Sequence, residues 1–214
     1  MRKDQSPLEQ LEALSEIRGI MERSTRFLSL SGWSGVWAGL MASSGCIIAH
    51  AQLNNYYRQY NERGGFDQAA YLDLRNQLFY LGITVFVLAL SGAFLFTLRK
   101  VRQQNADIWG PASRRFLYGL AIPVAAGAVM VLAFLHNNHM EYVAPACLLF
   151  YGLGLYNAGK FTLDDIRYLG LIEILLGAIC LFAPDLGLYF WGFGFGLMHI
   201  VYGIIMWNKY DRRS

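Results

Sequence analysis

The chain has 214 residues, a formal net charge of +3, 55% hydrophobic residues and only 15% charged residues. Soluble domains carry about 25% charged residues, so this composition excludes a disordered chain and disfavours an ordinary water-soluble enzyme. The basic residues form short clusters at predicted helix ends, which argues against nucleic-acid binding. Three cysteines cannot form a disulfide framework. The composition therefore favours an all-α, polytopic membrane protein.

Residues 1–26 predict an amphipathic cytoplasmic helix. Ser6, Pro7 and Glu9 follow the pattern of an N-cap, a first-turn proline and a capping-box acid. Apolar residues from Leu8 onward then recur at helical spacing, opposite a row of glutamates. This acidic face argues against a dedicated anchor for anionic lipids. Packing on the rest of the protein is favoured, and binding to a lipid surface or a partner helix stays open.

The region 27–207 predicts a bundle of six transmembrane helices arranged as three hairpins. An apolar run of about 20 residues crosses the hydrocarbon layer, and the predicted spans are 27–50, 78–98, 116–136, 143–160, 168–184 and 188–207. Residues 51–77 form a long outer loop that we expect to be a helical hairpin. Its chain turns at Arg63-Gly64-Gly65, and Asp67 caps the returning helix.

The distribution of basic residues predicts the orientation of the bundle. If both termini lie inside, 15 of the 18 Lys and Arg residues are cytoplasmic, and only Arg58, Arg63 and Arg75 fall outside. Cytoplasmic loops carry such an excess of positive charge. We therefore expect an N-in, C-in protein of a bacterial inner (cytoplasmic) membrane, with residues 208–214 as a cytoplasmic tail.

The third hairpin carries motifs that resemble those of known membrane proteins. It reads Gly170-Leu-Ile-Glu-Ile-Leu-Leu-Gly177, then Pro184 and Gly192-Phe-Gly-Phe-Gly196, and it closes on His199-Ile-Val-Tyr-Gly203 and Lys209-Tyr210. These features resemble HdeD-type six-helix bacterial proteins and six-helix membrane proteins of Bacteroidetes type. The resemblance implies the six-span plan and no transferable catalytic residues. The long outer loop departs from the HdeD pattern.

Glu173 and His199 are ionisable residues within predicted spans, where such residues are costly and indicate function by default. At 1.5 Å per residue both lie in the inner half of the bilayer, on adjacent antiparallel helices, with Asn157 near the same layer. A proton-linked or substrate-binding site is one interpretation. The favoured one is a structural pair that fixes the register of the hairpin.

A second candidate site lies at the predicted outer ends of the helices. Cys46 and His50 share one helix face, His136 and His139 end the third span, and two further cysteines fall at the same level, namely Cys147 and Cys180. Thiolate and imidazole ligands suit Zn, Cu or haem iron. The favoured alternative is that the cysteines are small apolar residues and the histidines form a polar turn, so that no cofactor is bound.

Small residues predict close helix packing in two spans. Gly35 and Gly39 on the first span, and Gly192 and Gly196 on the sixth, have four-residue spacing. Contacts within the bundle are favoured over the seam of a homo-oligomer.

No nucleotide-binding or hydrolase motif is present. We therefore expect a non-enzymatic accessory, sensory or scaffold protein that lies in the lipid bilayer. Its N-terminal helix or its cytoplasmic loops would bind partner proteins. A small proton-linked transporter or channel centred on Glu173 and His199 is the first alternative. A metal- or haem-binding redox protein is the second.

Overall fold

The computed structural model describes residues 30–103 and 109–212. The regular structure in these ranges is entirely helical. The amphipathic helix predicted for residues 1–26 lies outside the described residues.

The helices alternate in direction along the chain. The first five long ones are α2 (Gly32–Arg63), α3 (Gln68–Gln103), α4 (Pro111–His136), α5 (Val143–Ala158) and α6 (Asp164–Phe182). A composite segment follows, here called the C-terminal helix (187–211). It consists of α7 (Gly187–Trp191), the π-helix η4 (Gly192–Met198), α8 (His199–Met206) and the π-helix η5 (Trp207–Asp211). Short 3-10 turns flank α5 and precede α7, namely η1 (Met140–Tyr142), η2 (Gly159–Phe161) and η3 (Pro184–Leu186).

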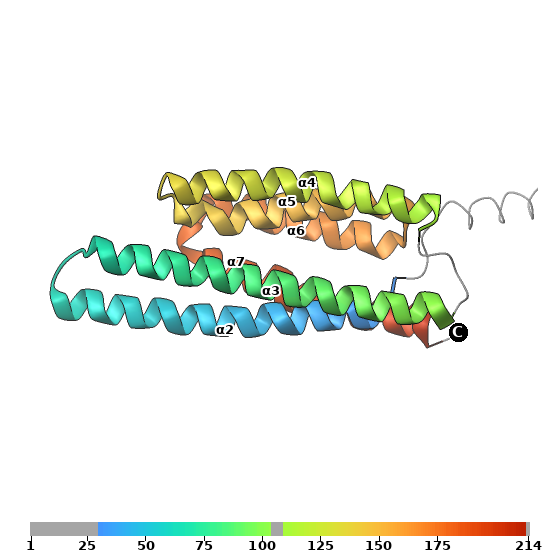
Figure 1. Cartoon of the computed structure of the whole chain (residues 1–214), viewed down its shortest axis with the longest axis horizontal. Coiled ribbons are helices and arrows are strands. Elements are labelled where there is room, and N and C mark those ends of the chain that lie inside the picture. Colours follow the sequence, from blue (N-terminus) through green and yellow to red (C-terminus); the bar gives the residue numbers. More distant parts are fainter. Residues whose placement is uncertain (1–29, 104–108, 213–214) are drawn as a thin grey trace, which may run out of the picture.

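The helices form two layers (Figure 1). In one layer α5 packs between α4 and α6, and in the other α2 packs against both α3 and the C-terminal helix. The C-terminal helix also contacts α5 and α6, so it joins the two layers. The membrane span predicted at 188–207 lies within this helix, which continues to Asp211.

The protein is a membrane protein. Four of its helices are long and apolar enough to cross a membrane, namely α2, α3, α4 and the segment Pro184–Asp211. Their outer surfaces carry exposed apolar side chains such as Ile47, Phe86 and Ile122, which lipid can cover. Helix α5 has only 16 residues and α6 carries four charged residues. The six-span topology therefore stays a prediction.

The α2–α3 hairpin extends beyond the other helices (Figure 1). Its helices of 32 and 36 residues are about 48 and 54 Å long at 1.5 Å per residue. The chain turns at Gly64, whose φ of 72° is left-handed, and Asp67 Oδ1 accepts a hydrogen bond of 2.9 Å from the Ala69 amide. This is the turn and cap that the sequence predicts.

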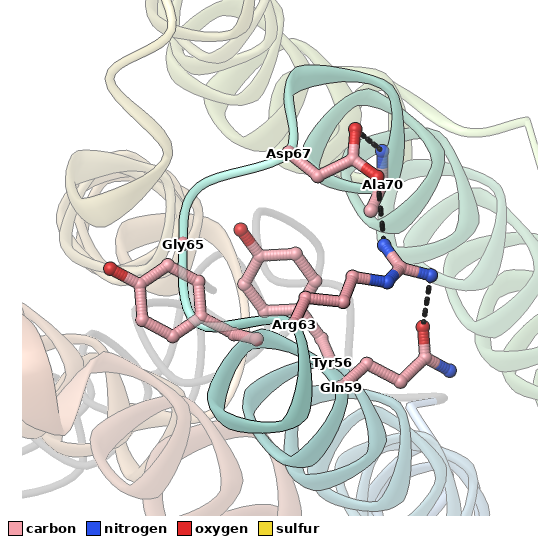
Figure 2. A pocket seen from close by; sticks show the side chains of 7 residues that line it. Tyr56, Gln59, Arg63, Gly65, Asp67 and Ala70 are labelled. Atoms are coloured by element: carbon pink, nitrogen blue, oxygen red, sulfur yellow. Dashed lines mark hydrogen bonds and ion pairs between the residues drawn. The ribbon is translucent and has the colours of Figure 1, made fainter.

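The tip of the hairpin carries a small hollow (Figure 2). There the Arg63 guanidinium donates to Asp67 at 2.8 Å and to Gln59 at 3.2 Å. The hollow between these groups, Tyr56 and Tyr60 measures only about 10 Å³, which is about the space of one water molecule. The tip is therefore a turn closed by polar contacts, with no room for a ligand.

Glycines bring α2 and the C-terminal helix into backbone contact. A Cβ placed on Gly203 would lie 2.5 Å from the Val36 nitrogen, and one on Gly39 would lie 2.7 Å from the Gly196 carbonyl oxygen. Gly35 faces Gly203 in the same way. Small residues permit this approach in membrane helices, so the glycines predicted to pack do so within one chain.

Candidate functional site

The candidate site is centred on Glu173 of α6, whose side chain is 0% exposed. Neither of its carboxyl oxygens has a hydrogen-bond partner among the described residues. Buried polar groups are almost always hydrogen-bonded, and an orphaned one calls for an explanation. A charged carboxylate in this position, within an apolar bundle, costs several kcal/mol. A site that binds a proton or another cation removes that cost.

His199, at the start of α8, is the nearest ionisable neighbour of this carboxyl group. Its Nδ1 lies 3.5 Å from Glu173 Oε1 and 3.1 Å from the Gly194 carbonyl oxygen. Its Nε2 lies 2.8 Å from the Tyr151 hydroxyl of α5. In a neutral histidine these contacts are satisfied when Nδ1–H donates to Gly194 and the Tyr151 hydroxyl donates to Nε2. The imidazole is thus held at both nitrogens, while Glu173 is held at neither oxygen.

Aromatic rings fix the plane of the His199 ring. The Phe195 ring stacks on it with centroids 5.9 Å apart, and the Tyr151 ring lies 5.4 Å away. Phe195 and Tyr151 also contact each other, at 5.0 Å. The histidine therefore keeps its orientation toward Glu173 through packing as well as hydrogen bonds.

The π-helix η4 shapes the wall opposite Glu173. The carbonyl oxygen of Gly194 in this π-helix lies 3.1 Å from Nδ1 of His199, five residues later. Gly194 has no side chain, so the Glu173 carboxyl group lies directly against its backbone. A Cβ there would collide with Glu173 Oε2 and lie 2.7 Å from Leu148 Cδ2. π-Helical turns occur frequently at functional sites, and this one provides both an acceptor and space.

The site has two proton arrangements that need little movement. In the first, His199 is neutral as described and the Glu173 carboxylate is unpaired. In the second, one added proton resides on the Glu173–His199 pair and removes the isolated charge. When that proton is on Glu173, His199 can accept from the carboxyl group at Nδ1 and donate from Nε2 to Tyr151, and the Gly194 carbonyl then loses the imidazole donor. This proton arrangement thereby changes the hydrogen bond between the His199 side chain and the backbone of the π-helix.

Asn157, predicted near the layer of Glu173 and His199, has no hydrogen bond with either residue, and its polar atoms bond elsewhere. Its amide nitrogen donates to the Gly119 carbonyl of α4 at 3.2 Å, and its oxygen accepts from Lys160 at 3.3 Å. Asn157 follows Tyr151 by six residues, which is about 9 Å along α5. It therefore joins α5 to α4 near one end of the bundle.

The outer histidines and cysteines are not gathered into one cluster. His50 on α2 contacts Asn54 at 3.0 Å, whereas His139 beyond α4 pairs with Glu141 at 3.1 Å, and α2 and α4 lie in different layers. His136 is exposed, and the Cys46 thiol lies 3.6 Å from the Leu188 carbonyl oxygen. Within residues 30–103 and 109–212, no three His, Cys, Asp or Glu side chains are placed to hold a metal ion. The separation of α2 from α4 opposes the hypothesis of a shared metal or haem site.

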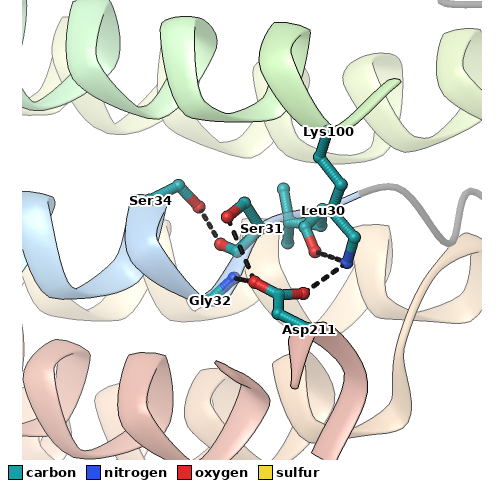
Figure 3. A network of polar contacts seen from close by, with 6 residues as sticks. All are labelled: Leu30, Ser31, Gly32, Ser34, Lys100 and Asp211. Atoms are coloured by element: carbon teal, nitrogen blue, oxygen red, sulfur yellow. Dashed lines mark hydrogen bonds and ion pairs between the residues drawn. The ribbon is translucent and has the colours of Figure 1, made fainter. Parts of the chain in front are cut away.

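A polar network lies at the end of the bundle that is far from the α2–α3 turn (Figure 3). Lys100 at the end of α3 forms an ion pair of 2.6 Å with Asp211, and these side chains are only 10% and 12% exposed. Lys100 also donates to the Leu30 carbonyl at 2.9 Å, while Asp211 accepts from the Gly32 amide at 2.9 Å and from Ser31 at 3.2 Å. Asp211 falls in the predicted cytoplasmic tail, yet it joins the start of α2 to the ends of α3 and the C-terminal helix.

Tyr151, next to His199, and Asp211, next to Lys100, have no functional role in the sequence-based hypotheses. Tyr151 is one of several tyrosines in apolar segments, and only its spacing from the helix ends sets it apart. Asp211 offers a clearer signal, because an acid next to a predicted membrane helix with a nearby lysine can form an interhelical ion pair.

Comparison with known proteins gives no family for this chain. No protein-family model, curated protein or solved structure matches it. The likeness to HdeD-type proteins remains an expectation drawn from sequence motifs. The functional conclusions below therefore depend on the geometry of the site.

Proposed function

We propose that this is a non-enzymatic sensory protein of a bacterial cytoplasmic membrane, in which the Glu173–His199 pair takes up and releases a proton. The observation that supports this most directly is the fully buried Glu173 carboxyl group with no hydrogen-bond donor. A purely structural pair would normally satisfy both partners, as His199 is satisfied here. The sensory role is one form of the accessory function expected from the sequence.

The π-helix supplies the link between protonation and conformation. Gly194 and His199 belong to the same C-terminal helix, which contacts α2, α5 and α6. When the Gly194 carbonyl loses or regains the imidazole donor, the π-helical turn shifts between two hydrogen-bonding patterns. Packing against three neighbours then transmits that shift to the ends of the helix.

We expect infrared spectroscopy to detect the protonation of Glu173. In acid-minus-alkaline difference spectra of the lipid-reconstituted protein, the wild type should show the C=O stretch of a protonated carboxyl in apolar surroundings. Glu173→Gln, which keeps the shape of the side chain, should remove that band. The matched control Glu62→Gln alters an exposed acid on the α2–α3 hairpin and should leave the band unchanged.

The proposal fails if Glu173→Gln leaves every carboxyl band of the difference spectrum as it is in the wild type. A second measurement separates sensing from transport. Proteoliposomes that contain a pH-sensitive dye should show the same slow acidification with wild type and with Glu173→Gln. A flux that only the wild type supports would replace the sensory role by proton transport at the same site.

We also propose that all six helices span the membrane with both termini in the cytoplasm. The described basic residues support this orientation, because those near the Lys100–Asp211 end outnumber Arg58, Arg63 and Arg75 near the other. In a cysteine-free background, Gly65→Cys should react with an impermeant maleimide on intact cells, since nothing lies within 4 Å of a Cβ at this position. Gln103→Cys should react only after the membrane is opened, and the reverse pattern would contradict the orientation.

A further inference from the structure

An apolar groove runs along one side of the α2–α3 hairpin, near the end that carries Lys100. It is lined by Trp37, Gly92, Leu95, Phe96 and Arg99 and has a volume of about 240 Å³. Compact ligands occupy pockets of roughly 300–1,000 Å³ with several polar groups. This groove is smaller, and its lining is apolar except at the arginine. Its volume and its apolar lining suit a hydrocarbon chain.

The floor of the groove is fixed by Trp37. Its indole nitrogen donates to the Leu88 carbonyl oxygen at 2.9 Å, and its ring lies against Gly92, where any Cβ would collide with it. The indole is thereby held flat between α2 and α3, with Phe96 beside it at 6.4 Å between centroids. Since its polar atom is satisfied, the surface it presents to the groove is apolar.

Two arginines stand at the end of the groove. Arg99 lines it, and Arg102 lies three residues on, so both guanidinium groups share one face of α3. Neither has a hydrogen bond or an ion pair in the described part of the chain, and both are exposed. Lys100, between them, is directed to Asp211 instead. Two arginines without an acidic partner among the described residues therefore lie beside the apolar groove.

We infer that this groove binds an anionic phospholipid, with one acyl chain along Trp37, Leu95 and Phe96 and the phosphate between Arg99 and Arg102. Guanidinium groups bind phosphate oxygens in a bidentate manner, and basic clusters at the ends of membrane helices attract anionic headgroups. A peptide or a second copy of this chain would need polar groups or acids to match the arginines. The membrane surrounding α3 supplies phospholipid at this position directly.

The groove can be tested with phospholipids whose acyl chains carry bromine, which quenches nearby tryptophan fluorescence. The reporter is a variant in which Trp37 is retained and the other four tryptophans are replaced by phenylalanine. In mixed vesicles, brominated phosphatidylglycerol should displace phosphatidylcholine from Trp37 with a preference of roughly fivefold or more. Arg99→Gln/Arg102→Gln should reduce that preference to about one.

The matched control is Arg114→Gln/Arg115→Gln, which removes the same charge from exposed positions at the start of α4. It should keep the full preference for phosphatidylglycerol. Equal quenching by both lipids in the parent, or equal loss of preference in the two double variants, would overturn the site.

Should the single-tryptophan variant not fold, native mass spectrometry of the otherwise unchanged protein makes the same comparison. More retained phosphatidylglycerol than phosphatidylcholine, lost only in Arg99→Gln/Arg102→Gln, would support the site. Equal retention of both lipids, or an equal loss in both double variants, would overturn it.

Discussion

Lys100→Met should lower the free energy of unfolding by about 3–5 kcal/mol, because it removes one partner of a buried ion pair. The two side chains form an ion pair of 2.6 Å and are 10% and 12% exposed, so solvent screens the pair only weakly. The Gly32 amide and the Ser31 hydroxyl also donate to Asp211, but as neutral groups they do not replace the Lys100 ammonium group. Unfolding in mixed detergent, followed by circular dichroism, measures the change.

Two further variants test the origin of this effect. Lys100→Met/Asp211→Leu should recover most of the loss, since it removes both charges from the buried network. Arg58→Met breaks the ion pair between Arg58 and Glu62, two side chains that are 72% and 70% exposed. It should lower the free energy of unfolding by less than about 1 kcal/mol. If Lys100→Met is as mild as Arg58→Met, the network contributes little to stability.

Gly203→Ala is expected to destabilise the bundle by about 1–3 kcal/mol through overpacking. The new methyl group would lie 2.5 Å from the Val36 nitrogen and 2.9 Å from the Gly32 carbonyl oxygen, and both are backbone atoms that cannot rotate away. Helix α2 and the C-terminal helix must therefore separate. The same detergent titration reports the loss.

Gly82→Ala is the matched control for this substitution. Gly82 lies within α3, and nothing is found within 4 Å of a Cβ built there. Alanine is the better helix former by up to about 1 kcal/mol, so this variant should equal or exceed the wild type in stability. Equal stability of the two alanine variants would show that the helices tolerate a wider spacing.

The local chemistry of the sequence was sufficient to predict the hairpin between α2 and α3. Gly64 adopts the left-handed conformation that the Arg63-Gly64-Gly65 turn requires, and Asp67 caps the returning helix. The number of residues from each helix end likewise predicted that Glu173 and His199 lie at similar depths in the bundle. Both predictions depend only on residue spacing along single helices.

Other features depend on how helices rotate about their axes, which spacing alone does not specify. Tyr151 reaches His199 only because α5 presents that face to the C-terminal helix. Asn157 lies on the same helix but bonds to α4. The π-helix is a third case, since the Gly-Phe-Gly-Phe-Gly run predicts close packing without predicting wider turns.

The contact between Asp211 and the start of α2 has a consequence for biogenesis. The Gly32 amide and the Asp211 carboxylate are 179 positions apart in the chain. Helix α2 emerges from the ribosome before its packing partner in the C-terminal helix, because α3, α4, α5 and α6 are synthesised between them. During that interval the glycine-lined face of α2 must remain in contact with lipid or an insertion factor. Assembly of this bundle is therefore completed only after translation has reached its final described helix.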